Sequence, residues 1–321
     1  MACFMLKHVQ DFRNHAFNDL WKRCMTRSNN ASANSLRLYS YAIIPVLIWS
    51  INMAVTKYSA SVIEPVSISF WRLFIALLLI APFVLPTVRV QWYQIRQHWM
   101  KLLVLGFLAM TIYQCLSYWA GHSTTATNMS IINAFTPIFT ILVSLIVLSE
   151  KPSRYGVLGS FISLVGLFYL IGQGSLLGLF KGSFYLGDGL MIIAVLAYAL
   201  YGVLLRHWQL PISLGLSLFV QTALALFMHI PLLMYFGLDA LTEANISPIL
   251  YVALLPSIVA PFLWMKAMQT LGPNRSSIFT NLGPVITAVI AYFYLGEQWV
   301  LYHTIGTAMV ITGVILAQRK A

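Results

Sequence analysis

The sequence predicts an all-α integral membrane protein with ten transmembrane helices, arranged as two inverted repeats of five helices. Three observations support this prediction. The chain is 60% hydrophobic and only 8% charged, with a mean hydropathy of +0.81, which is far too apolar for a water-soluble core and surface. It contains ten apolar runs of membrane-crossing length. Finally, part of its first half recurs in its second half.

The ten apolar runs lack the alternation of barrel strands, so we expect helices, which satisfy their own backbone hydrogen bonds in lipid. Proline, glycine or charged residues separate most of them. The expected spans are 39–57, 66–86, 99–119, 129–148, 155–172, 188–206, 212–236, 249–268, 276–296 and 302–318.

The repeat is visible at an offset of 147 residues, where Asn128 to Glu150 align without a gap with Arg275 to Glu297. Identical residues include Pro137 and Pro284, as well as the two closing glutamates. The same offset places Gly159 on Gly306 and Gly166 on Gly313. A duplicated membrane unit is typical of transporters, although duplication alone is also compatible with a passive scaffold.

The positive charges indicate the orientation of the chain. With a cytoplasmic N-terminus, 16 of the 19 lysines and arginines fall on the inner side, leaving Lys57, Arg72 and Lys181 toward the outer half. Both termini are therefore expected in the cytoplasm. Because each half has five spans, the second half must enter the membrane from the opposite side, which makes the repeats inverted and suits alternating access.

The duplicated residues resemble a known family. Trp49, Lys57, Pro65, Arg72, Pro137, Glu150 and the glycine pair are similar to one EamA unit, and Ala197-Tyr198-Ala199, Arg206, Pro284, Glu297 and the second glycine pair are similar to another. The chain thus resembles the ten-helix EamA-type exporters of the drug/metabolite transporter superfamily over about residues 38–318. The resemblance implies export of amino acids, other small metabolites or drugs through a central cavity between the halves.

This organisation divides the chain into five parts. They are a cytoplasmic N-terminal segment (1–37), a first repeat (38–172), a link (173–187), a second repeat (188–318) and a cytoplasmic tail (319–321). The first part mixes cations with aromatic residues, which favours an amphipathic helix on the inner leaflet, a disordered tail, or a translation start at Met25. It lacks the apolar core of a cleavable signal peptide.

The best site candidates are polar and aromatic residues near the middle of the spans, where contact with lipid is unfavourable. Facing a shared cavity, they offer hydrogen bonds and ring contacts to a small organic substrate; the alternative is contact between helices or an interfacial aromatic belt. The candidates are Trp49, Asn52, Arg72, Tyr113, Gln114, Trp119, Asn133, Thr136, Tyr198, Tyr201, Trp264 and Asn281.

Arg72 has two possible roles. It lies about two turns inside the second span, where an unpaired cation costs several kcal/mol. It either attracts a substrate carboxylate or extends outward to Glu64 and the interface. In the second half, Leu218 stands opposite the Arg72 region, so any charge in the cavity is asymmetric.

Other repeated positions favour structural roles. Pro137 and Pro284 are expected well inside their helices, where they produce kinks that shape the cavity or act as hinges. The four glycines recur seven residues apart on one helical face, which favours close helix packing. Glu150 and Glu297 end their spans at opposite faces, where we favour boundary anchors over gates.

Other function classes lack their motifs. Cysteines and histidines show no metal-ligand spacing, and we expect His122 and His229 near the interface rather than in proton transfer. The sequence has no P-loop, serine-hydrolase or zinc-protease motif, so neither an ATP-driven pump nor an intramembrane enzyme is predicted.

We therefore expect a secondary transporter without cofactor or metal. It would export a small-molecule substrate across the bacterial inner membrane, with the lipid bilayer as a partner and no nucleic acid; a monomer is plausible. The alternatives are a nucleotide-sugar or phosphate exchanger of the same superfamily and a non-transporting membrane sensor or assembly factor.

Overall fold

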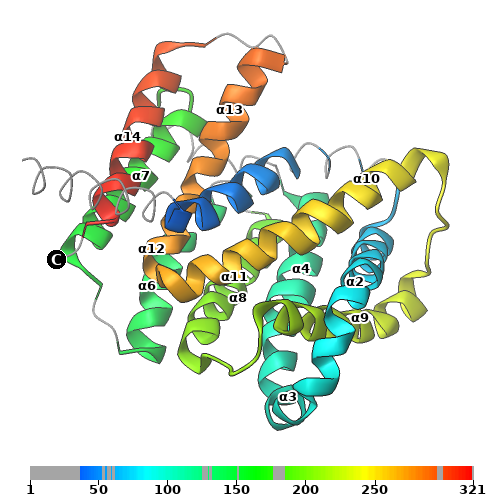
Figure 1. Cartoon of the computed structure of the whole chain (residues 1–321). Helices are drawn as coiled ribbons and strands as arrows, with labels where there is room; N and C mark the ends of the chain where they lie inside the picture. Colours follow the sequence, from blue (N-terminus) through cyan, green and yellow to red (C-terminus); the bar gives the residue numbers. More distant parts are fainter. Residues whose placement is uncertain are drawn as a thin grey trace, which may run out of the picture. The chain divides into compact units, whose positions relative to one another are not determined.

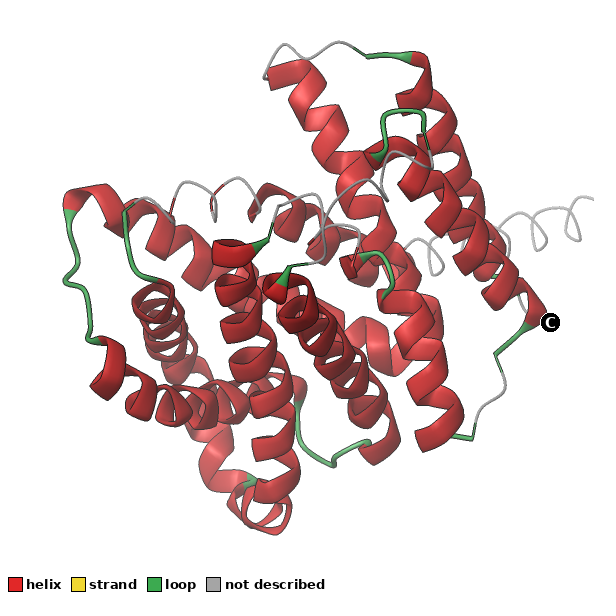
Figure 2. Ribbon diagram, turned by 180° about the vertical axis from the view of Figure 1, so that it is seen from behind, coloured by secondary structure: helices red, strands yellow, loops and turns green. Residues whose placement is uncertain are grey.

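The computed structural model describes residues 37–52, 55, 59, 62–124, 129, 132–149, 152–175, 185–294 and 299–319. Every regular element among these residues is a helix (Figures 1 and 2). The chain divides into two compact units, Met1–Tyr41 and Ala42–Ala321. Within the described part of the first unit, the Arg37 Nε donates to the Tyr41 hydroxyl over 3.1 Å. Everything below concerns the second unit.

The first half begins with a helix over residues 37–52. The elements that follow are α2 (Pro65–Val90), α3 (Trp92–Gly106), the π-helix η1 (Phe107–Ile112), α4 (Tyr113–Ser123), α6 (Thr136–Val147) and α7 (Arg154–Ile171).

The second half repeats this order closely. Its elements are α8 (Leu186–Trp208), α9 (Leu214–Phe236), α10 (Glu243–Leu254), the π-helix η3 (Leu255–Val259), α11 (Ala260–Thr270), α12 (Pro273–Ser277), the 3₁₀-helix η4 (Ile278–Asn281), α13 (Leu282–Tyr294) and α14 (Leu301–Ala317).

Local sequence explains where several helices start. Pro65 opens α2, where its missing N–H is not needed by the helix. The Ser153 hydroxyl accepts the Gly156 N–H at 2.9 Å at the start of α7. The Asp188 carboxylate accepts the Tyr185 N–H at 2.7 Å at the start of α8. These caps satisfy backbone donors that the helices leave free.

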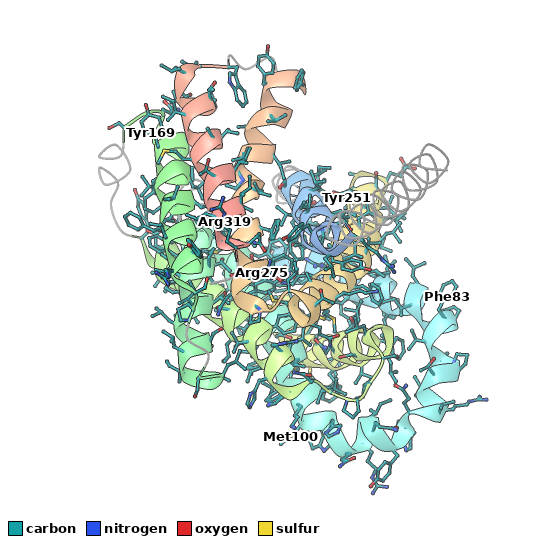
Figure 3. All side chains as sticks on the ribbon, turned by 60° about the vertical axis from the view of Figure 1, so that its left-hand side comes forward. Phe83, Met100, Tyr169, Tyr251, Arg275 and Arg319 are labelled. Atoms are coloured by element: carbon teal, nitrogen blue, oxygen red, sulfur yellow. The ribbon has the colours of Figure 1, made fainter. Side chains whose placement is uncertain are left out.

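Six helices, some continuing through a π-helix, are long and apolar enough to cross a membrane by length and composition. They are Pro65–Val90, Trp92–Ala120, Arg154–Ile171, Leu186–Trp208, Leu214–Phe236 and Glu243–Thr270, and the shorter apolar helices are Thr136–Val147 and Leu301–Ala317. Large apolar side chains point outward from these helices. Phe83 on α2 is 83% exposed and extends away from the ribbon (Figure 3), as expected for contact with lipid.

The helix interruptions occur at equivalent places in the two halves. Adding 147 to the range of η1 gives 254–259, and η3 occupies Leu255–Val259. The same offset relates the turn at Ala134 and Phe135 to the end of η4 and the start of α13. The duplication seen in the sequence therefore extends to the irregular parts of the backbone.

Two pairs of equivalent helices pack across the halves (Figure 1). In one pair, α7 and α14 approach so closely that a Cβ on Gly159 would lie 2.5 Å from the Gly313 carbonyl oxygen, and a Cβ on Gly166 would lie 3.0 Å from that of Gly306. The contact is crosswise, because Gly159 corresponds to Gly306 in the repeat yet meets Gly313. Such reciprocal pairing is the pattern of a local two-fold axis between two antiparallel helices.

The second pair is α2 and α9, which is tied at both ends. At one end, the Asp239 carboxylate, just beyond α9, accepts the Glu64 N–H at 2.8 Å. At the other end, the Gln91 side-chain oxygen accepts the N–H of Ser213 at 3.1 Å. These bonds fix the two helices against each other along their length.

Candidate substrate site

Five of the predicted site residues form one cluster of aromatic rings. Tyr198 on α8 lies at its centre, with ring-centroid distances of 4.8 Å to Tyr113 and 5.7 Å to Tyr201. The rings of Trp49 and Trp264 complete the cluster at 6.3 and 6.5 Å from Tyr198, and they lie 5.3 Å from each other. The cluster joins the first helix, α4, α8 and α11, so both halves of the chain contribute to it.

The cluster combines buried anchors with accessible rings. Trp264 and Tyr201 are only 1% and 2% exposed, whereas Trp49, Tyr113 and Tyr198 are partly accessible. The buried Trp264 Nε1–H has no acceptor among the described residues. The cluster thus offers aromatic faces for an apolar or cationic group, together with an unused hydrogen-bond donor.

A polar group around Arg72 adjoins the rings, since the Arg72 charge acts on the Tyr113 phenol. Arg72 on α2 is 6% exposed, and its Nε donates to the Ser257 hydroxyl of η3 at 2.9 Å. Its Nη1 donates to the Gln114 side-chain oxygen at 3.0 Å, and Gln114 follows Tyr113 directly at the start of α4. π-Helical turns often occur at functional sites; here Ser257 lies in η3 and Gln114 lies two residues after the end of η1.

This arrangement decides the direction in which Arg72 extends. Its hydrogen bonds hold it inside the bundle, rather than toward Glu64, whose backbone N–H is bound by Asp239. Ser257 was not among the predicted site residues, because serine is common between packed helices and nothing in its sequence context indicates an arginine partner. Its hydroxyl also donates to the Val252 carbonyl at 2.6 Å, so it presents its lone pairs to Arg72.

His229 corrects one expectation. We expected it at the interface, yet it is fully buried inside α9. Its Nδ1 lies 2.8 Å from the Ala225 carbonyl oxygen, and its Nε2 lies 3.8 Å from the Cys115 sulfur of α4. The backbone carbonyl supplies the polar partner that water would have supplied at an interface, which allows the ring to lie within the bundle.

The remaining candidates are distributed differently. Asn133 lies beside the Tyr113 phenol, and the Thr136 hydroxyl donates to the Asn133 carbonyl. Asn281 is 1% exposed and donates to the Ser163 hydroxyl at 3.0 Å, so it links η4 to α7. The ring of Trp119 lies 5.6 Å from that of Phe236, and it is not part of the aromatic cluster.

Asn52 lies in the first helix, three residues beyond Trp49, and it is not free, because it interacts with another residue. Glu150 and Glu297, the proposed anchors or gates, lie outside the described residues, as do Lys57, residues 1–36 and most of the link between the repeats.

The prolines also differ from expectation. Pro137 was expected well inside a helix, but it lies in the first turn of α6, after a turn at Ala134 and Phe135. Pro284 lies in the first turn of α13, directly after η4. In both halves the helix is already interrupted, so the proline starts a new segment, where its missing N–H breaks no hydrogen bond.

Taken together, a duplicated set of apolar helices with a buried polar and aromatic group between its halves defines a polytopic membrane protein of transporter type. The EamA-like transporter family model matches residues 36–172 and again 185–318. The chain belongs to this family.

Several relatives share most of the chain. One is "Uncharacterized transporter YyaM" of Bacillus subtilis, 26% identical over 81% of this chain and 87% of that protein. Another is "Probable terminal-alkyne amino-acid exporter" of Streptantibioticus cattleyicolor, 25% identical over 67% of this chain and 71% of that protein. A solved crystal structure is similar with a TM-score of 0.72 at 15% identity, covering 88% of this chain and 96% of the other, which concerns the fold alone.

Proposed function

We propose that this protein is a secondary transporter that exports small metabolites, amino acids or related compounds, across the cytoplasmic membrane by alternating access. The observation that carries the proposal is the cluster of Trp49, Tyr113, Tyr198 and Trp264 beside the buried Arg72. Partly accessible rings next to a buried charge suit a small amphipathic molecule better than they suit helix packing alone. The relative named as a probable amino-acid exporter agrees with this cargo.

Alternating access is supported by the crosswise contact of α7 and α14. A local two-fold relation between antiparallel helices is what inverted repeats would produce, and inverted units can pack in two nearly equivalent ways. On this basis we propose ten spans in two five-helix repeats with both termini in the cytoplasm. The first helix (37–52), the broken span of residues 129–148 and the short helices α13 and α14 would bring the six long ones to ten.

The energy source follows from what the sequence lacks. No P-loop occurs in the chain, so transport would run on the substrate gradient or on proton exchange. A nucleotide-sugar or phosphate exchanger is the competing cargo class. It would need several cations near the rings, whereas in the described part of the chain Arg72 is the cation bonded there.

Flux into proteoliposomes tests the proposal directly. Purified protein would be reconstituted and offered a panel of labelled amino acids, including a terminal-alkyne amino acid, with nucleotide sugars and cationic drugs as competing classes. Saturable counterflow of amino acids is expected. A folded protein that moves no member of the panel would support the sensor or assembly-factor alternative instead.

Topology requires its own measurement. Single cysteines introduced at Arg319 and in the loop between α9 and α10 would be labelled with an impermeant maleimide in intact cells. We expect labelling in the loop only, because both termini are placed inside. Labelling at position 319 from outside would refute the ten-span arrangement.

A further inference from the structure

The guanidinium of Arg72 is buried without a counter-charge. Two neutral oxygens, from Ser257 and Gln114, accept its hydrogen bonds. Among the described residues no carboxylate forms an ion pair with it, although the residue is only 6% exposed. A buried cation normally requires an anionic partner, so this environment is incomplete.

The hydrogen-bonding capacity of the group is also only partly used. A guanidinium has five N–H donors, and the two bonds occupy Nε and one hydrogen of Nη1. The described residues provide no acceptor for Nη2. The outer edge formed by Nη1 and Nη2 is the geometry that binds a carboxylate through two parallel hydrogen bonds.

A second unpartnered polar group lies on the same helix, α2. Ser69 precedes Arg72 by three residues, which places the two on neighbouring positions of the same helical face. Ser69 is 1% exposed, and its hydroxyl has no hydrogen-bond partner among the described residues. A buried orphan hydroxyl is uncommon in folded proteins and indicates a missing partner.

The charge is confined to one half. At the offset of 147 residues, position 72 corresponds to Phe219, a partly buried apolar residue, and its neighbour Leu218 is fully buried at 1% exposure. Arg72 is therefore not part of the duplicated framework that forms the fold. A residue that only held α2 in place would be expected to have an equivalent on α9.

We propose that the outer edge of Arg72, assisted by the Ser69 hydroxyl, binds the carboxylate of the transported substrate. This inference rests on the proposed function and specifies its substrate class as amphipathic monocarboxylates, amino acids included. Gln114 of α4 and Ser257 of η3 are positioning residues, because their hydrogen bonds orient the guanidinium. The apolar body of the substrate would extend over Tyr113 and the rings beyond it, since the Arg72 charge acts on the Tyr113 phenol.

Paired probes that differ only in charge provide the test. Counterflow of phenylacetate and phenylacetamide, and of L-leucine and L-leucinamide, would be compared in proteoliposomes of the full chain. We expect the R72Q variant to transport each acid at least tenfold more slowly, while transport of each amide stays within twofold of the unsubstituted protein. R72K should transport the acids at a rate between those of R72Q and the unsubstituted protein, because lysine keeps the charge but lacks the paired N–H groups that bind a carboxylate.

Arg206→Gln is the matched control. Arg206 is a half-buried arginine on α8 whose Nη1 donates to the Gln269 carbonyl at 2.6 Å, and it should leave the ratio of acid to amide transport unchanged. Equal losses for acids and amides in R72Q would assign Arg72 a structural role and overturn the proposal. So would unaltered acid transport.

A binding measurement distinguishes the carboxylate subsite from the transporter proposal. The thermal stability of the detergent-solubilised full chain would be measured with and without phenylacetate and L-leucine. Stabilisation of the unsubstituted protein and of R206Q, but not of R72Q, supports the carboxylate subsite even if no flux is found. Transport of the amides without any stabilisation by either acid would reject the subsite and leave the transporter proposal intact.

Discussion

Arg72 donates a 2.9 Å hydrogen bond to Ser257, 185 residues further along the chain. The bond joins α2 of the first half to η3 of the second. The other partner of Arg72, Gln114, is the second residue of α4, which follows η1 directly. A motion that alters either π-helical segment would therefore change the contacts of the arginine. This relationship couples the proposed binding group to the interface between the halves.

Neutralising Arg72 should stabilise the empty protein. In Arg72→Met, a buried charge without a described counter-ion is replaced by an apolar side chain of similar length, which removes a desolvation penalty on the order of several kcal/mol. We expect the midpoint of thermal unfolding in detergent to rise by several degrees. Arg206→Met, which removes a half-buried charge bonded to the backbone, should not raise it. A lower midpoint for Arg72→Met would mean that the arginine holds the bundle together.

Gly159 should not tolerate a side chain. Its Cβ would lie 2.5 Å from the Gly313 carbonyl oxygen and 2.7 Å from the Ala317 nitrogen, both backbone atoms of α14 that cannot rotate away. Gly159→Ala should therefore push α7 and α14 apart and cost about 1–3 kcal/mol of stability. Thermal unfolding in detergent measures this loss.

Gly189→Ala is the control for this substitution. A Cβ at Gly189, in α8, would meet no atom within 4 Å, so the change should be neutral or slightly stabilising through its better helix propensity. If Gly159→Ala left the unfolding midpoint at the value of Gly189→Ala, the close approach of α7 and α14 would be contradicted.

Much of this architecture could be predicted from the sequence, because helices in lipid depend on long apolar runs and on small residues at their contacts. The order of the helices, the glycine positions and the aromatic candidates of the cluster all follow from such patterns. The two π-helices were not predicted: Phe107–Ile112 is apolar apart from Thr111, and Pro256 in Leu255–Val259 is a signal of an interruption that the search for apolar runs passes over. Ser257 lies in one of these segments and Gln114 just after the other, and so Ser257 was missed.

The prolines and His229 show a second limit of the sequence. Pro137 lies in an apolar run that looks continuous, yet the turn before it has already ended the preceding helix. His229 was expected near water because an unpartnered imidazole is unfavourable in lipid, but a carbonyl of its own helix provides the partner. Both outcomes depend on local hydrogen bonding that periodicity does not reveal.

Removing the Asp239 carboxylate should loosen the tie between α9 and the start of α2. Its Oδ2 accepts the Glu64 N–H at 2.8 Å, where a side-chain oxygen satisfies a free donor at a helix N-terminus. Asp239→Ala should cost about 0.5–2 kcal/mol of stability. Asp239→Asn keeps an acceptor oxygen and should recover most of this loss in the same unfolding assay. Equal losses in both variants would assign the effect to charge rather than to the hydrogen bond.

Trp49 should contribute to substrate affinity through its ring. It is partly accessible, and its ring contacts both Tyr198 and Trp264 at 6.3 and 5.3 Å. Replacement by leucine removes an aromatic face worth about 0.5–1.5 kcal/mol, so KM for a transported aromatic substrate should rise roughly three- to tenfold. The maximal counterflow rate should change less, because the hydrogen bonds of Arg72 are untouched.

Trp99→Leu provides the comparison for Trp49. Trp99 lies on α3, is 49% exposed and is not part of the aromatic cluster, so its loss should leave KM unchanged. Quenching of tryptophan fluorescence by bound substrate offers a second measurement, which should weaken in Trp49→Leu and persist in Trp99→Leu. If both variants had the KM of the unsubstituted protein, the rings around Tyr198 would be a packing core, and the substrate would have to bind elsewhere between the halves.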